Sequence, residues 1–222
     1  MAEILPIGFG WNYPLTWELG RSPYAQPLHR RRCRQQPTEQ PVTLQEAILH
    51  LRLDPDAANG PEAPFIEGMI AAATRMFEQY ASAAVMKQRW QMSMNHFPAP
   101  TLPLEIPLPP FLELVSIDVN GHQEDIADYM VELDDRLPSR LYPLSHFWRV
   151  LPIPRTPGAI KIEWECGHEK PEDVPPTVKQ AIFMAMATWY ENRESLQQFT
   201  LNPMIEVGWD AILGHYREPG FA

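Results

Sequence analysis

The chain has 222 residues, a formal net charge of −10 and 45% hydrophobic residues, so it is long enough to bury a core without disulfide staples. Its two cysteines, Cys33 and Cys166, form no C-x-x-C motif, which indicates neither a zinc ribbon nor a disulfide framework. The N-terminus carries charge and proline, and no run approaches about 18 apolar residues, so we expect neither export nor membrane spanning.

Proline is in excess, with 25 residues against a usual share of about 5%. Six prolines lie in residues 1–41, six in 98–110 and eight in 111–176. Residues 65–97 and 177–202 contain none. Because proline removes a backbone donor and clashes with the preceding turn, these two stretches are where the long helix interiors are expected.

The first predicted helix covers about residues 43–52. Thr43 and Glu46 have the spacing of a capping box, in which each side chain satisfies a backbone N–H of the other residue. Apolar residues from Leu44 to Leu51 then follow at helical spacing. A second helix begins near Pro64, since proline is favoured in the first turn.

The pattern then changes to a period of two, which predicts strands with one buried face. The alternation runs first from Met86 to Met94. Asn120-Gly121 suits a type I′ turn and therefore a hairpin. The other predicted strands are 115–119, 129–133 and 160–164.

A third long helix is predicted from about Pro176 to Arg193, and a short last helix after Pro203. This order predicts an α+β fold: a small helical bundle with an inserted antiparallel β region, plus an extended N-terminal arm. The expected segments are the arm at 1–41, a helical entry and first strand at 42–97, the β insertion at 98–165 and the C-terminal helices at 166–222.

Motifs of catalysis are not found in the sequence. It has no glycine-rich phosphate loop, no G-x-S-x-G and no H-E-x-x-H, and its histidines are scattered. Cys, His and Glu occur close together only in Cys166-Gly167-His168-Glu169. We interpret this stretch as a strand end followed by a turn rather than as a metal or thiolate site. We therefore expect no enzyme, no cofactor and no metal.

Carboxylates gather between residues 118 and 135, a stretch without Lys or Arg. Their spacing does not match a calcium loop, so the simplest interpretation is a solvated acidic face. The residues are Asp118, Glu124, Asp125, Asp128, Glu132, Asp134 and Asp135.

Residues 1–41 carry a net charge of +2, which leaves −12 on the rest of the chain. The basic run at 29–34 could bind phosphates or an acidic protein neighbour, or simply be solvated. The arm is also too aromatic for an ordinary flexible tail, which favours a strap lying on another surface. The candidate partner-binding residues are Trp11, Tyr13, Trp17, Arg30, Arg31 and Arg32.

Several segments together resemble one family. The stretch from Val42 to Arg52 is followed by Trp90 in the first strand, by Gly158-Ala159-Ile160, and by Trp189-Tyr190-Glu191-Asn192-Arg193. In this order, over roughly residues 41–218, they resemble the head-tail connector proteins of tailed bacteriophages and gene transfer agents.

This resemblance implies a structural virion protein of the neck, with no catalytic activity and no cofactor. Such proteins form a dodecameric ring beneath the portal, extend the DNA channel, bind no specific DNA sequence and present a surface to the tail or stopper. The family places the C-terminal end against the portal. The candidate portal contacts are Trp209, Ile212, Leu213 and Tyr216.

An acidic channel wall would let DNA slide because it repels phosphates within the Debye length of about 8 Å. Some of the carboxylates at 118–135, or Glu163 and Glu165, are therefore expected to face the channel or its rim. Two other functions stay open from the sequence: another neck protein, such as a stopper or tail terminator, and a small metabolic enzyme with a polar pocket.

Overall fold

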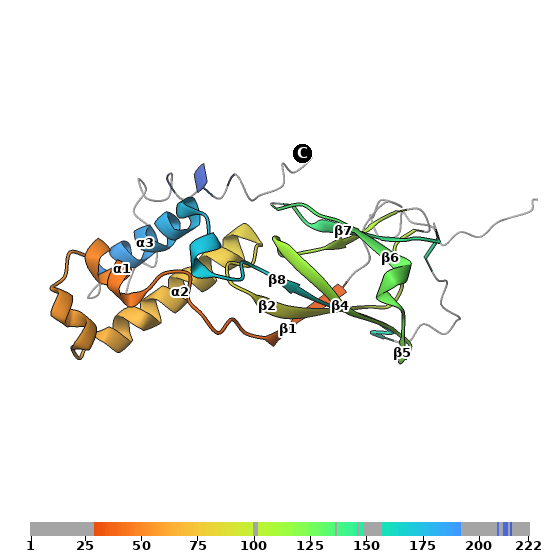
Figure 1. Cartoon of the computed structure of the whole chain (residues 1–222), viewed down its shortest axis with the longest axis horizontal. Coiled ribbons are helices and arrows are strands. Elements are labelled where there is room, and N and C mark those ends of the chain that lie inside the picture. Colours follow the sequence, from red (N-terminus) through yellow and green to blue (C-terminus); the bar gives the residue numbers. More distant parts are fainter. Residues whose placement is uncertain are drawn as a thin grey trace, which may run out of the picture.

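The computed structural model describes residues 29–99, 102–135, 137–145, 147–148, 157–191, 208, 211–212 and 214. Within them the molecule is elongated, with three α-helices gathered at one end and two β-sheets at the other (Figure 1). We call these parts the helical body and the β body. The predicted α+β class is confirmed.

The helical body contains α1 (Leu44–His50), α2 (Ala63–Ala81) and α3 (Pro176–Glu191), with short 3-10 helices at Pro55–Asn59 and Pro171–Asp173. The predicted capping box starts α1. Glu46 N donates to Thr43 Oγ1 at 3.2 Å, and Thr43 N donates to Glu46 Oε2 at 2.7 Å. The buried faces of α2 and α3 meet in one core, which includes Ile66, Phe77 and Ile182.

The β body contains two antiparallel sheets. The larger sheet has the order β1 (His29–Gln35), β2 (Gln88–Met94), β8 (Ile160–Cys166), β4 (Phe111–Val119) and β5 (His122–Gln123). The smaller has the order β3 (Leu104–Ile106), β7 (Ser139–Pro143) and β6 (Tyr129–Glu132). A short 3-10 helix, η3 (Ile126–Asp128), connects β5 to β6.

The larger sheet has one apolar and one polar face, as alternating strands require. Met92, Ile162 and Ile117 lie in register on β2, β8 and β4 and are buried in the core with residues of the smaller sheet, such as Leu141. The residues between them point to the outer face and are polar. The two sheets therefore share one hydrophobic core, separate from that of the helical body.

Most predicted strands are present with shifted ends. The hairpin at Asn120-Gly121 connects β4 to β5, and both residues have positive φ, at 54° and 81°, as a type I′ turn requires. Strands β1, β3 and β7 were not predicted. β1 lies inside the segment expected to be an arm, and it is an edge strand paired with β2 in the larger sheet.

Candidate functional site

A buried carboxylate joins the two bodies. Glu78, on α2, is 8% exposed, and its Oε1 accepts hydrogen bonds from Val85 N at 3.0 Å and from Gln88 Nε2 at 2.6 Å. Arg75 donates to its other oxygen at 3.2 Å, and Trp90 Nε1 donates to Gln88 Oε1 at 3.1 Å. This network fixes the direction in which the sheet leaves α2.

The end of β8 packs against the same connection. Gly167 has a φ of +96°, and a Cβ there would collide with the backbone carbonyl of Met86. His168 N donates to Val85 O at 3.1 Å. Cys166 is buried, and this burial raises the pKa of its thiol, so it is not poised as a thiolate. The structure thus has the expected strand end and turn here.

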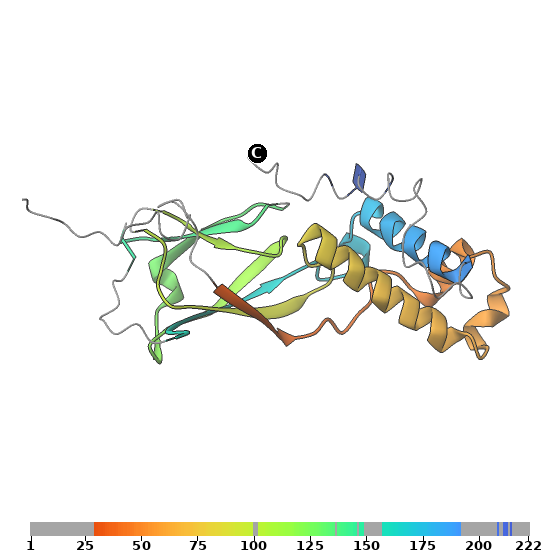
Figure 2. The ribbon, with the colours of Figure 1, turned by 180° about the vertical axis from the view of Figure 1, so that it is seen from behind.

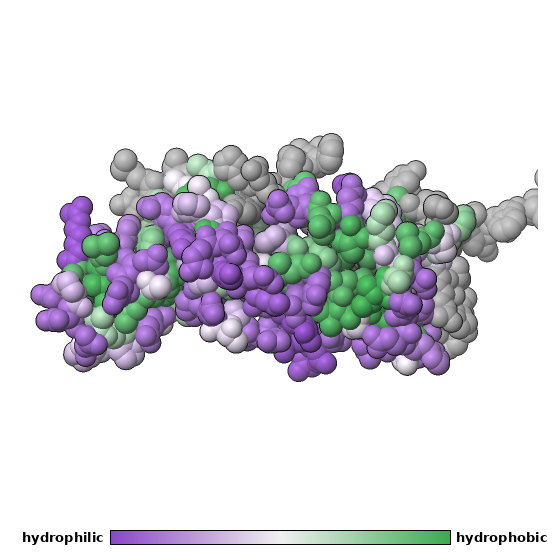
Figure 3. Space-filling model, viewed as in Figure 1, coloured by the Kyte–Doolittle hydropathy of each residue, from purple (hydrophilic) through white to green (hydrophobic). Residues whose placement is uncertain are grey.

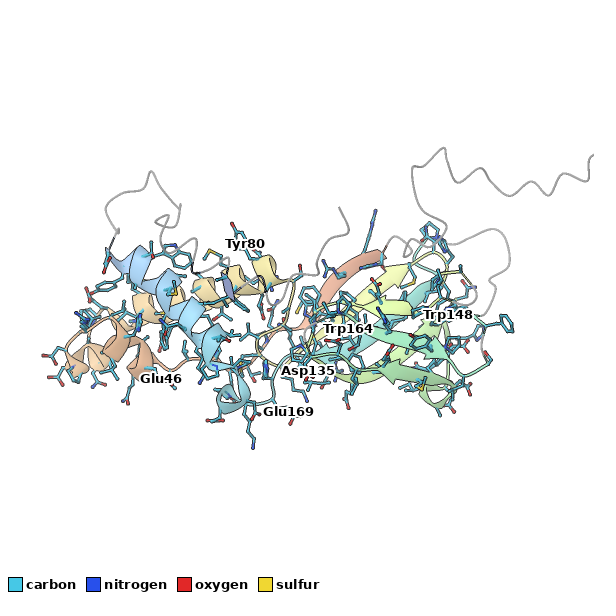
Figure 4. The ribbon with its side chains drawn as sticks, turned by 90° about the horizontal axis from the view of Figure 1, so that it is seen from above. Glu46, Tyr80, Asp135, Trp148, Trp164 and Glu169 are labelled. Atoms are coloured by element: carbon cyan, nitrogen blue, oxygen red, sulfur yellow. The ribbon has the colours of Figure 1, made fainter. Side chains whose placement is uncertain are left out.

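A groove of about 1000 Å³ lies between the two bodies. Val85 and Phe111 contribute to its walls, and Asp135 and Glu169 supply carboxylates. Figure 4 shows these two acidic residues in the middle of the molecule, between the helices and the sheets. Ile212 also lines this groove and packs against the core of the helical body.

The predicted portal contacts are only partly placed. Ile212 contacts its own subunit, as stated above, while Trp209, Leu213 and Tyr216 lie outside the described residues. The aromatic arm residues Trp11, Tyr13 and Trp17 also lie outside them.

The outer face of the larger sheet carries paired charges. Glu165 bridges Lys87 Nζ at 2.8 Å and Arg89 Nη2 at 2.6 Å, and these hydrogen bonds hold the pKa of Glu165 below its usual value. Glu163 accepts a hydrogen bond from Gln91 at 2.8 Å and forms an ion pair with Arg34 at 3.4 Å. Both carboxylates are therefore compensated by cations or donors of the same sheet.

The three other arginines of the basic run lie on β1. Arg30, Arg31 and Arg32 are exposed, and no described carboxylate forms an ion pair with them. Arg31 lines a smaller hollow beside Trp90 and the end of α2. The sequence shows these cations but gives no sign that they lie on the edge of a sheet.

The seven carboxylates between 118 and 135 lie on several elements. Four lie where the chain turns from β4 through β5 to η3: Asp118, Glu124, Asp125 and Asp128. Glu132 lies near Arg140 and accepts a hydrogen bond from Tyr142 at 3.0 Å. Asp134 Oδ1 accepts from Leu137 N, and Asp135 lines the groove.

Exposed apolar side chains gather on the β body. Figure 3 shows hydrophobic surface over the part of the molecule where β4, β6 and β7 lie in Figure 1. Met130 and Leu133 are 53% and 65% exposed. Extended apolar surface of this kind is typical of regions that contact another protein.

The described residues contain no group of three His, Cys, Asp or Glu side chains that could hold a metal ion. Among the helices in this part of the chain, none is both long and apolar enough to cross a membrane.

No protein-family model matches the sequence, and no curated protein matches it either. Solved structures do match. A chain in the neck of an empty GTA particle, computed with C6 symmetry, is 18% identical with a TM-score of 0.67, and the match covers 88% of this chain and 97% of that one.

Two further structures agree. A chain in the virion of the native gene transfer agent (GTA) particle is 17% identical with a TM-score of 0.63. A chain in the neck of the native GTA particle, computed with C12 symmetry, is 14% identical with a TM-score of 0.58. Each match covers 85% of this chain and 97% of the other. The chain therefore shares a fold with chains of these particles over 85–88% of its length.

Proposed function

We propose that the chain is a structural neck protein of a phage-like particle. It forms a ring beneath the portal, extends the DNA channel and presents a docking surface to the tail or stopper. One observation carries this proposal: the fold matches chains of GTA particles over 97% of their length, and two of those structures are necks. The sequence resemblance noted above points to the same assembly by an independent route.

The surface of the subunit supports a role in assembly. The apolar surface of the β body and the open basic strand β1 are regions that a partner would cover. In the described residues, polar groups that could act in catalysis are instead tied into the fold, as with Glu78 and Glu165.

Portal binding is assigned to the C-terminal segment. Ile212 packs against the helical body and lines the groove, so it gives this segment an attachment point on its own subunit. Trp209, Leu213 and Tyr216 are the proposed contacts with the portal, since large apolar groups contribute about 1.5–3 kcal/mol each when fully buried.

Carboxylates that are not paired within the larger sheet are the ones proposed to face the DNA channel. Asp135 is exposed, whereas Glu163 and Glu165 are paired with neighbouring side chains. Exposed carboxylates on the inner rim would repel the phosphates of passing DNA.

The test is to mix the full chain with isolated portal complexes and to measure the mass of the product. The proposal predicts portals that carry a ring of this chain, and portals that stay bare would contradict it. A truncation lacking residues 203–222 should keep the helix content of the full chain and fail to load. A truncated chain that loads normally would refute the assignment of portal binding to this segment.

A further inference from the structure

The β body has two edges of opposite charge. On one side, β1 pairs with β2 and has no described strand on its other side. Its residues Arg30, Arg31 and Arg32 are exposed and make no ion pair with a described residue. We call these three arginines the basic edge, and Figure 2 shows β1 as the outermost strand in front of β2.

The opposite side is formed by β4, β5 and η3. From Phe111 to Asp128 the sequence contains no Lys or Arg. β5 pairs with β4 only at Asp118 and Val119, so the earlier part of β4 has no described strand beyond it. We call the five carboxylates of this side the acidic edge: Glu113, Asp118, Glu124, Asp125 and Asp128.

The two edges match in height along the strands. Arg30 is in register with Ser93 on β2, Ser93 with Lys161 on β8, and Lys161 with Asp118 on β4. Asp118 is in turn in register with Gln123 on the outer strand β5, next to Glu124. Because each of these pairs is antiparallel, β1 runs antiparallel to β4. A rotation about an axis along the middle strands of the sheet would bring the basic edge of one copy beside the acidic edge of the next.

We propose that the basic edge of one copy of this chain binds the acidic edge of a second copy, and that this head-to-tail contact connects neighbours in the ring. The inference rests on the proposed function and names the partner of these two edges. A contact between two different surfaces closes into a ring when the rotation allows it, whereas a contact between identical surfaces stops at a dimer. Opposite charges also steer subunits into the correct register.

Two charge-reversal variants test the contact. The first carries Arg30→Glu and Arg32→Glu, and the second carries Glu113→Lys and Asp128→Lys. Asp118 and Asp125 are left unchanged because their side chains accept hydrogen bonds from Gly121 N and Ala127 N in local turns. The substitution Arg52→Glu, at an exposed site in the helical body, serves as a control for the reversal of an arginine charge away from the edges.

The measured quantity is the fraction of portal complexes that carry a ring of this chain. Each variant alone brings like charges together, so we expect ring loading to fall by about tenfold or more, while Arg52→Glu loads as the unchanged chain does. An equal mixture of the two variants should load again, because the reversed edge of one variant then faces the reversed edge of the other, which has the opposite sign, and the two unreversed edges face each other. A ring in which the two variants alternate needs an even number of subunits, and the twelvefold symmetry of a GTA neck meets this condition.

The outcomes separate the inference from the proposed function. If the unchanged chain does not load onto portals, the proposed function fails and the inference falls with it. If the unchanged chain loads and either reversed variant loads equally well, or the mixture stays unloaded, the function stands and the edge contact is refuted. If Arg30→Glu with Arg32→Glu leaves the ring intact and only lowers retention of double-stranded DNA, the basic edge faces DNA and the inference is wrong.

Discussion

The carboxylate of Glu78 accepts a hydrogen bond from the backbone N–H of Val85 at 3.0 Å. Through this bond the end of α2 holds the segment that leads into β2. The same oxygen accepts from Gln88, so one buried carboxylate satisfies a donor in the connection and a donor at the start of β2.

Replacing Glu78 by alanine is expected to lower the free energy of unfolding by about 2–4 kcal/mol, because it leaves buried donors without an acceptor. Chemical denaturation followed by circular dichroism measures this loss. Glu67→Ala on the exposed face of α2 is the matched control and should change stability by less than about 0.5 kcal/mol. Equal losses in the two variants would contradict the role given to Glu78.

Replacing glycine by alanine is expected to have opposite effects on stability at two positions. Gly167→Ala is expected to destabilise the fold by several kcal/mol, since its φ is +96° and the added Cβ would collide with the Met86 carbonyl. Gly68→Ala lies in α2 with open space around the added Cβ and should stabilise by about 0.5–1 kcal/mol. Thermal unfolding of both variants measures the two effects. If Gly167→Ala leaves the unfolding temperature unchanged, the close approach of Gly167 to the Met86 carbonyl is refuted.

Acid is expected to weaken the outer face of the larger sheet. The pKa of Glu165 is lowered in the folded state by hydrogen bonds from Lys87 and Arg89, so its contribution is present above the unfolded pKa of about 4.5 and is lost as the pH falls below it. Glu165→Gln should therefore flatten the dependence of unfolding temperature on pH between about 3 and 5. Glu67→Gln is the control, and an unchanged slope in Glu165→Gln would contradict the expectation.

Salt should weaken the contact between neighbouring subunits. If Arg30 and Arg32 face the carboxylates of the next copy, raising the salt concentration shortens the Debye length from about 8 Å at physiological ionic strength to about 3 Å at 1 M and screens the attraction. Rings on portals should then dissociate more readily, as measured by their mass. Rings that become more stable in high salt would indicate an apolar interface instead.

The sequence predicted those elements whose apolar spacing is set by one buried face. This holds for α2 and for β2, where Met92 and Met94 face the core between polar neighbours. It also held for the capping box at Thr43, since both partners are local. β1 could not be predicted in this way, because its arginines are exposed and show no apolar alternation.

The candidate functional site could not be predicted from the sequence, because it depends on contacts between segments that are distant along the chain. Glu163 and Glu165 looked like free carboxylates in the sequence, and only the strand register brings Gln91 and Arg89 beside them. The acidic stretch at 118–135 looked continuous, but the turns from β5 through η3 to β6 divide it. Charge could be read from the sequence, whereas its pairing could not.

The most direct test of the proposed function is to image the neck of particles that contain this chain at side-chain resolution. We expect a closed ring of the chain between portal and tail, with twelve copies if the ring follows the symmetry of the GTA neck. The β1 edge of each copy should face the acidic edge of the next. Particles whose neck lacks the chain, or holds it as isolated copies, would contradict the central claim.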